Sequence, residues 1–411
     1  MNKNNKQYFF ILGRNPELSI AEIVSLLKES GAKFELDLAI DCVLIISSAA
    51  LPDGFFDRLG GSKKFGEVKG KINSLSDIEM DNILGDYLKE DKFRFGFSFY
   101  NFSKNEFKKA QIAMHKQGLS YKKELKERGI KSRLVESRED ELSSVIVHKE
   151  KMIDGGADIV LIKYKDEIYY GKTLAVQDYN SFSARDYGKP GRDATSGMLP
   201  PKLARIMLNL ATYKTNKTLL DPFCGSGTVI LEALALEFKK IYGSDKSKVA
   251  VQDTETNLIW WQQRFVIGDI PEIKAVSIEQ LGSKYEKSSI DIIVTEPYLG
   301  PPLRGRESLD QMKSIQNELQ ELYRITLQEF LNVLKPDGRI VMIWPVFVDK
   351  RGDQLFLNLK DRLDKLNLEI VNCLTDYDLS ITQPTKYRQT YYYSREGQRV
   401  CREVVVLKRK N

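Results

Sequence analysis

Histidine and cysteine are scarce in this sequence, which has only two histidines and four cysteines among 411 residues. The cysteines lie far apart and form no Cys-x-x-Cys pair, at Cys42, Cys224, Cys373 and Cys401. Zinc sites and disulfide frameworks need such residues at close spacing. We therefore expect no metal and no disulfide. His115 and His148 have no neighbours that would complete a metal site or a catalytic triad, so we expect both to be structural.

Long hydrophobic runs are also missing. A membrane-spanning helix needs about 18 or more consecutive apolar residues, and no such run occurs. Residues 1–6 are polar and lead into strand-like sequence rather than into the apolar core of a signal peptide. The sequence therefore predicts a soluble, cytoplasmic protein with no membrane partner.

The remaining composition is that of a globular protein, with 42% hydrophobic and 29% charged residues, and the length allows two or three domains. The net charge of +6 is mild, but residues 104–133 carry ten Lys or Arg against three Glu. Such an excess would suit the phosphates of a nucleic acid, although a solvated helix face gives the same pattern.

The order of apolar patterns predicts four segments. Strand and helix patterns alternate in an α+β unit over residues 1–85 and in a second one, with the basic helix, over 86–179. Residues 180–201 are rich in glycine and proline and predict a linker or docking segment. In residues 202–411 helix patterns alternate with strands, which predicts βαβ units, a mostly parallel sheet and an α/β fold. The expected strand ends are Leu220, Ser244, Thr295 and Trp344.

A glycine-rich turn follows the first of these strands. It starts at Asp221, includes Phe223, Gly225 and Gly227, and leads into a helix pattern. Such a turn lets the backbone approach a ligand closely, and the helix N-terminus offers free N–H groups. Asp245 ends the next strand, where a doubly wound sheet places the acid that holds a ribose. We expect these five residues to bind S-adenosylmethionine, whose ammonium and ribose hydroxyls need carboxylates.

Other phosphate-binding turns fit less well. A dinucleotide fingerprint needs glycine or alanine where Ile230 stands, and a P-loop needs Gly-Lys-Ser/Thr in the turn. The segment 171–173 reads Gly-Lys-Thr, but Asp166 occupies the position of the required first glycine. We interpret that segment as an ordinary turn.

A third acid should end the third strand and contact the adenine. Two positions remain open, Asp269 after the run 265–268 and Glu279 after the run 274–278. We favour Glu279, because it leaves room for one short helix before the next strand and because the residues around Asp269 resemble a turn.

The fourth strand runs into an acid, a proline and an aromatic residue, at Glu296, Pro297 and Tyr298. An exocyclic amine of a purine is a weak nucleophile because its lone pair is delocalised into the ring. The carboxylate of Glu296 and the carbonyl of Pro297 would accept its protons and align the nitrogen for in-line methyl transfer. Tyr298 would stack on the base. We therefore predict that these three residues are catalytic.

Three segments together resemble the THUMP-domain tRNA guanosine N2-methyltransferases that act at position 10 of tRNA: residues 192–204, the turn at Asp221 and the segment at Thr295. Residues 129–135 and 142–145 are similar to THUMP segments that grip the tRNA acceptor end, and residues 171–177 are similar to the end of that domain. The resemblance implies a ferredoxin-like domain over residues 1–85, a THUMP domain over 86–179, a donor-pocket segment over 180–201 and a Rossmann-like, doubly wound methyltransferase domain over 202–411.

The resemblance also implies the reaction and the partners. It indicates S-adenosylmethionine as methyl donor, the 2-amino group of a tRNA guanosine as acceptor, and Lys131 and Arg133 as tRNA contacts, with Arg185 and Arg192 as weaker candidates. The family's usual catalytic string is Asp-Pro-Pro-Tyr, so either Glu296 or Thr295 stands at the acid position. We prefer Glu296, because only a carboxylate is a strong charged acceptor.

Two other functions remain open at this point. One is an adenine-amine methyltransferase that acts on DNA or ribosomal RNA, which would use the same donor turn. The other is an RNA-binding scaffold with a degenerate methyltransferase domain. The sequence also leaves open whether a small activating subunit is required.

Overall fold

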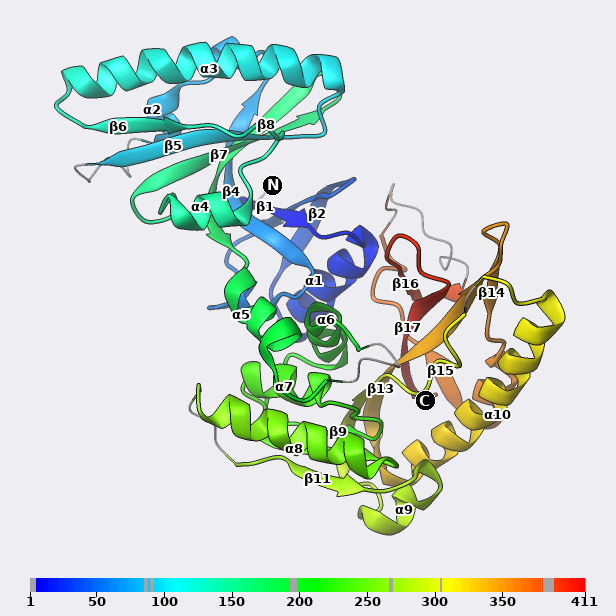
Figure 1. The fold of residues 1–411 in the computed structure, drawn as a ribbon. Helices are drawn as coiled ribbons and strands as arrows, with labels where there is room; N and C mark the ends of the chain where they lie inside the picture. Colours follow the sequence, from blue (N-terminus) through cyan, green and yellow to red (C-terminus); the bar gives the residue numbers. More distant parts are fainter. Residues whose placement is uncertain are drawn as a thin grey trace. The chain divides into compact units, whose positions relative to one another are not determined.

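The computed structural model describes residues 5–84, 88, 92–192, 198–265, 269–303, 305–377, 379 and 388–410 (Figure 1). The chain divides into two compact units, each assembled from three separate stretches. Unit 1 consists of residues 1–16, 32–57 and 62–179, and unit 2 of residues 17–31, 58–61 and 180–411. The polypeptide therefore passes from one unit to the other five times.

Unit 1 is built on one eight-stranded sheet with the strand order β2-β3-β1-β4-β8-β7-β5-β6. The strands are β1 (Lys6–Leu12), β2 (Phe34–Ile40), β3 (Val43–Ser48), β4 (Ser62–Ile72), β5 (Phe93–Tyr100), β6 (Ser132–Val135), β7 (Gly156–Tyr164) and β8 (Glu167–Val176). Strands from both sides of residue 85 share this sheet. The division into a ferredoxin-like and a THUMP domain stays a prediction.

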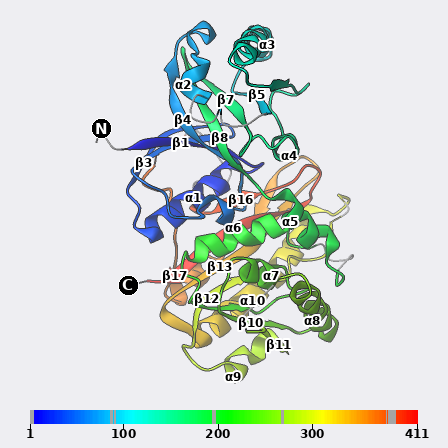
Figure 2. The same cartoon turned by 90° about the vertical axis from the view of Figure 1, so that its left-hand side faces the viewer.

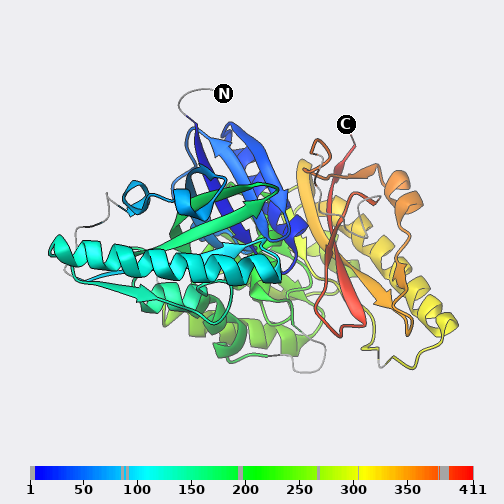
Figure 3. The ribbon, with the colours of Figure 1, turned by 90° about the horizontal axis from the view of Figure 1, so that it is seen from above.

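The main helix of unit 1 is α3 (Lys104–Glu127), which forms where the basic helix was predicted. A capping box starts it: the Ser103 N–H donates to the Glu106 carboxylate, and the Glu106 N–H donates to the Ser103 hydroxyl. Apolar residues of α3, among them Met114 and Tyr121, pack on β5 and β7, and its lysines are exposed. Figure 3 shows the helix running along this sheet. Shorter elements are η1 (Phe56–Arg58), η2 (Leu75–Asp77), α2 (Met80–Leu84) and α4 (Ser144–Lys149).

Unit 2 contains a nine-stranded sheet whose main path is β11-β10-β9-β12-β13-β17-β15, with β14 paired to β13 and β16 to β17. The strands are β9 (Thr218–Asp221), β10 (Lys240–Asp245), β11 (Glu272–Ala275), β12 (Ile290–Thr295), β13 (Leu334–Val348), β14 (Gln354–Phe356), β15 (Leu368–Ile370), β16 (Tyr391–Tyr393) and β17 (Val400–Arg409). The pairs from β11 to β13 are parallel, and those with β14 to β17 are antiparallel.

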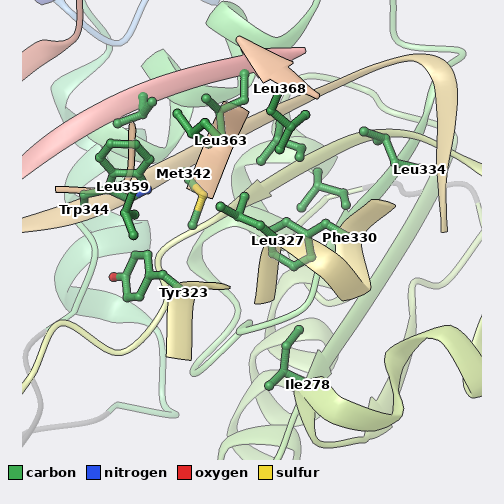
Figure 4. Packing of buried hydrophobic residues seen from close by; sticks show 14 of the residues in the cluster. Ile278, Tyr323, Leu327, Phe330, Leu334, Met342, Trp344, Leu359, Leu363 and Leu368 are labelled. Atoms are coloured by element: carbon green, nitrogen blue, oxygen red, sulfur yellow. The ribbon is translucent and has the colours of Figure 1, made fainter. Parts of the chain in front are cut away.

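Helices cover both faces of this sheet (Figures 1 and 2). Helices α6, α7 and α8 lie on one face, and α9 and α10 on the other. Buried residues of α10, among them Tyr323, Leu327 and Phe330, pack against Met342 and Trp344 of β13 (Figure 4). The helical elements are α1 (Pro16–Ser30), α5 (Tyr179–Ser183), the π-helical turn η4 (Ala184–Gly188), α6 (Pro201–Ala211), α7 (Thr228–Ala235), α8 (Lys248–Gln262), η5 (Ile278–Gln280), α9 (Leu281–Lys284), α10 (Leu309–Val333) and α11 (Lys360–Lys365). Among the described helices, none is both long and apolar enough to cross a membrane.

Helix α1 comes early in the chain but packs within unit 2. The buried carboxylate of Glu22 accepts hydrogen bonds from the N–H groups of Gly60 and Gly61, each at 2.8 Å, and from the Asn209 side chain at 2.7 Å. Burial raises the pKa of Glu22 to about 7, against these hydrogen bonds. Three discontinuous stretches of sequence are thereby joined in one polar network.

The strand order confirms the predicted doubly wound, Rossmann-like α/β fold. The order reverses at β9, which has β10 on one side and β12 on the other. In an open α/β sheet, ligands bind in the crevice at the carboxyl ends of the strands where the order reverses. The fold therefore points to the ends of β9, β10 and β12 as the site.

Candidate active site

The turn between β9 and α7 has positive φ angles at two of its glycines, as a glycine-rich turn predicts. Gly225 and Gly227 have φ values of +53° and +79°, which favour glycine. A Cβ atom at position 227 would lie 2.8 Å from Thr254, whereas no heavy atom lies within 4 Å of a Cβ placed at position 225. The Thr254 hydroxyl also donates to the Gly225 carbonyl at 2.7 Å. The turn is thus held by α8 on one side and is open beside Gly225.

Asp221 ends β9 as a buried carboxylate without a basic partner among the described residues. It accepts hydrogen bonds from the Thr295 hydroxyl at 2.7 Å and from the Phe223 N–H at 3.2 Å. Burial raises the pKa of Asp221 to about 7 despite these bonds, and the nearby carboxylates of Asp245 and Glu296 raise it further. A cationic ligand group beside Asp221 would relieve this unfavourable charge.

Asp245, at the end of β10, is half-buried and braces the same turn. One oxygen accepts from the Gly225 N–H at 3.1 Å, and the other accepts from the Ser247 N–H at 2.9 Å. Because β9 and β10 are parallel, with Gly243 opposite Asp221, both acids lie at the carboxyl edge. Within the described part of the chain, no group of three or more His, Cys, Asp or Glu is arranged to hold a metal ion.

The predicted linker is fastened to this turn by two side chains that the sequence did not single out. The Lys189 ammonium donates to the hydroxyls of Ser226 at 3.1 Å and Thr228 at 2.7 Å, and burial lowers the pKa of Lys189 to about 8. Asn257 of α8 exchanges hydrogen bonds with the backbone of Gly191 and also donates to the Ser226 carbonyl. A local sequence motif does not predict the roles of Lys189 and Asn257, because their contacts join segments that are distant in sequence.

Arg185, a predicted RNA contact in the linker, is buried rather than exposed. Its guanidinium pairs with the Glu232 carboxylate, which also pairs with Arg205 at 2.8 Å. The ring of Phe182 lies against both guanidiniums. This buried position does not favour contact with a phosphate of RNA. Arg185 instead has a structural role, because it joins η4 to Glu232 on α7, the helix that follows the glycine turn.

The third strand bears on the choice between Asp269 and Glu279. Strand β11 pairs with β10 so that Ala275 lies opposite Asp245, which puts the carboxyl edge at Ala275. Glu279 follows this edge in η5, whereas Asp269 precedes the strand, and both are exposed. The structure thus favours Glu279, and its contact with adenine stays a prediction. Of the alternative run 265–268, residues 266–268 lie outside the described residues.

The segment after β12 brings the predicted catalytic residues to the same crevice. Thr295 is fully buried and its hydroxyl donates to Asp221, so its side chain is not presented to a substrate amine. The Glu296 side chain is 14% exposed, Pro297 is buried, and Tyr298 as a residue is 54% exposed. This arrangement favours the register in which Glu296 is the acid.

Glu296 has a partner that the sequence analysis missed. The Arg402 guanidinium, on β17, donates from Nε to Oε1 at 2.6 Å and from Nη2 to Oε2 at 3.4 Å. The signal was present in the sequence, because Arg402 and Glu403 interrupt an apolar strand pattern. Only the order of strands in the sheet shows that one of them reaches Glu296.

The remaining predicted RNA contacts are exposed. In unit 1, Lys131 directly precedes β6, and the Arg133 side chain on β6 is 67% exposed, with Nη1 3.5 Å from a Glu150 oxygen. In unit 2, Arg192 is exposed and lies over the ring of Tyr187 at 5.8 Å. These three positions are compatible with contact to RNA, which stays a prediction.

Comparisons with known proteins agree with this geometry. Residues 191–349 match the model of the RMKL-like methyltransferase domain, and residues 89–256 match a model described as DNA methylase. The first match includes the glycine turn and the Glu296 segment, whereas the second ends before Glu296. The chain also resembles the solved structure of TrmN from Thermus thermophilus, with a TM-score of 0.53, 15% identity and coverage of 98% of this chain and 99% of that one, which shows a shared fold.

Two curated relatives are archaeal. The chain is 31% identical to the tRNA (guanine(10)-N2)-dimethyltransferase of Methanothermobacter thermautotrophicus over 45% of this chain and 49% of that protein, so it spans about half the length of that relative. It is 30% identical to the "Probable tRNA (guanine(10)-N2)-dimethyltransferase" of Methanothermococcus thermolithotrophicus over 43% of this chain and 94% of that protein. With the fold and the crevice described above, these matches show that the chain belongs to the tRNA (guanine(10)-N2)-dimethyltransferase family.

Proposed function

We propose that this protein transfers a methyl group from S-adenosylmethionine to the 2-amino group of a guanosine in tRNA, at position 10. One observation carries the proposal: the Glu296 carboxylate and the turn of Asp221 and Asp245 lie at the carboxyl ends of adjacent parallel strands. A methyl donor and a purine amine bound there would meet at one edge of the sheet.

The residues of the turn fit the donor. The buried carboxylate of Asp221 suits the ammonium group of S-adenosylmethionine, and Asp245 at the end of the next strand would accept from its ribose hydroxyls. The open space beside Gly225 lets the backbone approach the ligand. We assign Phe223 and Gly227 of the turn, and Glu279 of η5, to the same donor pocket. When bound, the donor supplies a methyl group on a positively charged sulfur.

Glu296 and Pro297 act on the acceptor. The carboxylate and the Pro297 carbonyl accept the two N–H bonds of the amine, which orients its lone pair toward the methyl carbon. As the nitrogen–carbon bond forms, the carbon–sulfur bond breaks and its electrons stay on sulfur. The methylated nitrogen then loses one proton to solvent or to the carboxylate. The exposed Tyr298 ring offers a surface on which the flipped base can stack.

Unit 1 supplies the contacts to the folded RNA. Lys131 and Arg133 lie together at β6 and present their charges to solvent, and Arg192 does so in unit 2. Phosphate contacts of this kind position a nucleic acid without reading its sequence. Activity in the cytoplasm would follow from a tRNA substrate.

The test is to incubate the protein with methyl-labelled S-adenosylmethionine and unmodified tRNA, and then to map the labelled nucleoside. We expect N2-methylguanosine or N2,N2-dimethylguanosine at position 10. A matched tRNA with inosine at position 10 lacks only the 2-amino group and should receive no label there. Labelled N6-methyladenosine would replace this proposal by the adenine-amine reaction, and donor binding without transfer to any RNA would leave a scaffold.

A further inference from the structure

The ion pair between Arg402 and Glu296 is the feature of this site that the reaction described above does not explain. Both side chains are largely buried, with 8% of Arg402 and 14% of Glu296 exposed. A buried ion pair has to offset the cost of removing two charges from water, so its presence is weak evidence for a role in stability alone. Its place at the catalytic carboxylate suggests another role.

Strand register explains how Arg402 reaches Glu296. Thr295, which directly precedes Glu296, lies opposite Met342 of β13, and Arg402 of β17 lies opposite Pro345 of the same strand. The guanidinium therefore spans β13 to meet the carboxylate. Because it contacts both oxygens, it restricts rotation of the glutamate side chain, which has one more rotatable bond than aspartate.

The other charged groups near Glu296 carry charge of the same sign. Asp221 on β9 and Asp245 on β10 form a cluster of negative charge with it, and the buried Tyr323 hydroxyl of α10 is neutral and donates to the carbonyls of Tyr298 and Ile343. Burial raises the pKa of Tyr323 well above its usual value, and the Glu296 charge raises it further. Arg402 is the positive group that the described residues place against this carboxylate.

We propose that Arg402 is a positioning residue that keeps Glu296 ionised and fixes both carboxylate oxygens in place for the substrate amine. This inference rests on the proposed role of Glu296 as the amine acceptor. Arg402 does not touch the substrate in this scheme. In this scheme Glu296 aligns the N–H bond, and the proton leaves after the nitrogen–carbon bond has formed.

The chain offers a matched control on the next position of β17. Glu403 is fully buried and accepts from Arg388, with Nε–Oε1 at 2.5 Å and Nη2–Oε2 at 3.1 Å, and from the Thr390 hydroxyl. Successive residues of a strand point to opposite faces of the sheet, so this second Arg–Glu pair does not contact Glu296. Arg388→Met thus removes a comparable buried ion pair away from the catalytic carboxylate.

The experiment compares Arg402→Met, Arg402→Lys and Arg388→Met with the wild type. We expect Arg402→Met to lower kcat about 100-fold at pH 7 and to move the acidic limb of its pH profile upward by about one unit or more, because the carboxyl loses its neighbouring cation. The affinity for S-adenosylhomocysteine should stay unchanged. Arg402→Lys retains the charge and should restore the position of the limb, but only part of kcat, because an ammonium cannot make the two-point contact.

A second measurement does not depend on turnover. In protein labelled with ¹³C at the glutamate carboxyl carbon, the Glu296 signal is the one missing from Glu296→Gln. Its titration midpoint should rise in Arg402→Met and stay unchanged in Arg388→Met. If both variants only lose stability, with neither the midpoint nor the pH limb moved, Arg402 is merely structural and the inference is wrong. If wild-type protein methylates no guanosine but the midpoint still rises, the proposed function fails and the pairing stands.

Discussion

Two buried aspartates at opposite edges of the unit 2 sheet have pKa values shifted in opposite directions. Asp291, at the amino end of β12, accepts from Lys335 at 2.9 Å, from Lys217 at 3.2 Å and from the Thr218 N–H at 2.8 Å. Burial would raise its pKa, but these partners outweigh burial and lower the pKa to about 2. Asp221, at the carboxyl end of β9, lacks such cations, and its pKa rises to about 7.

The comparison distinguishes two roles for a buried carboxylate. Asp291 stabilises the fold through its lysine partners, whereas Asp221 is proposed to bind a cationic group of a ligand. Both carboxylates are buried, so burial alone does not distinguish them. The amino edge supplies its own counter-charges, whereas the carboxyl edge leaves Asp221 with hydrogen bonds alone. Glu296 is intermediate, because it lies at the carboxyl edge but carries a cation from β17.

The largest effect of the predicted substitutions is expected at Glu296, because its charge is proposed to act on the substrate amine in the transition state. Glu296→Gln keeps the shape of the side chain but removes its charge, and we expect kcat to fall by roughly 100-fold or more, the scale of one preorganised electrostatic group. Binding of S-adenosylhomocysteine should be spared. Single-turnover methylation of tRNA and calorimetric titration measure the two quantities, and undiminished turnover would remove Glu296 from the mechanism.

Replacement of Asp221 should weaken ligand binding and strengthen the fold. Asp221→Asn removes the charged acceptor for the donor's ammonium, which is worth about a 10- to 100-fold loss in affinity for S-adenosylhomocysteine. The raised pKa of Asp221 means that wild-type stability falls as the pH rises from the unfolded value near 4 through about 7. At pH 8 the variant should therefore be more stable than the wild type, and the difference should disappear near pH 4 in urea denaturation.

Asp291→Asn should have the opposite effect on stability and none on ligand affinity. Its lowered pKa stabilises the fold above the unfolded value near 4, and this contribution is lost as the pH falls toward about 2. Because the lysine partners are 33% and 35% exposed, water screens the pairs, and we expect a loss of about 1–2 kcal/mol at pH 7. If Asp221→Asn and Asp291→Asn changed stability in the same direction, the contrast between the two edges would be wrong.

The smallest effect is expected for Lys131, which is exposed and is proposed to contact a phosphate of the RNA. Lys131→Ala should weaken tRNA affinity modestly and lower the slope of log affinity against log salt by about one, without moving the modified position. The exposed Lys360 of α11 is a suitable control, because its loss should leave the slope unchanged. An unaltered slope in Lys131→Ala would count against a direct phosphate contact.

Local sequence patterns were sufficient to predict the framework of the site. The apolar run before Asp221, the glycines at positions 225 and 227 and the acid at position 245 form a strand, turn and helix that depend mainly on neighbours in the chain. The parallel order of strands then places Glu296 beside them. These features follow from hydrophobic periodicity and from backbone angles that favour glycine.

The partners of these residues could not be predicted in the same way. Arg402 meets Glu296 across 106 residues of sequence, and Lys189 meets Thr228 across 39. Arg185 is a predicted tRNA contact, but its partner in the structure is Glu232, which lies on a helix with a mostly apolar sequence pattern. Such pairings depend on strand order and on which faces of helices meet, and a single sequence does not encode them as a local pattern.

Helix α1 shows why unit 2 cannot be isolated by cutting the chain once, since the chain passes between the two units five times. A fragment that starts at residue 180 would lose the helix whose Glu22 bonds to Asn209, and with it the short stretch at Gly60 and Gly61. Unit 2 would then expose the residues that pack against the buried side of α1, so we expect such a fragment to aggregate. A module joined by one peptide bond can be removed by a deletion at a single junction, whereas removal of either unit from this chain would require breaks at several junctions.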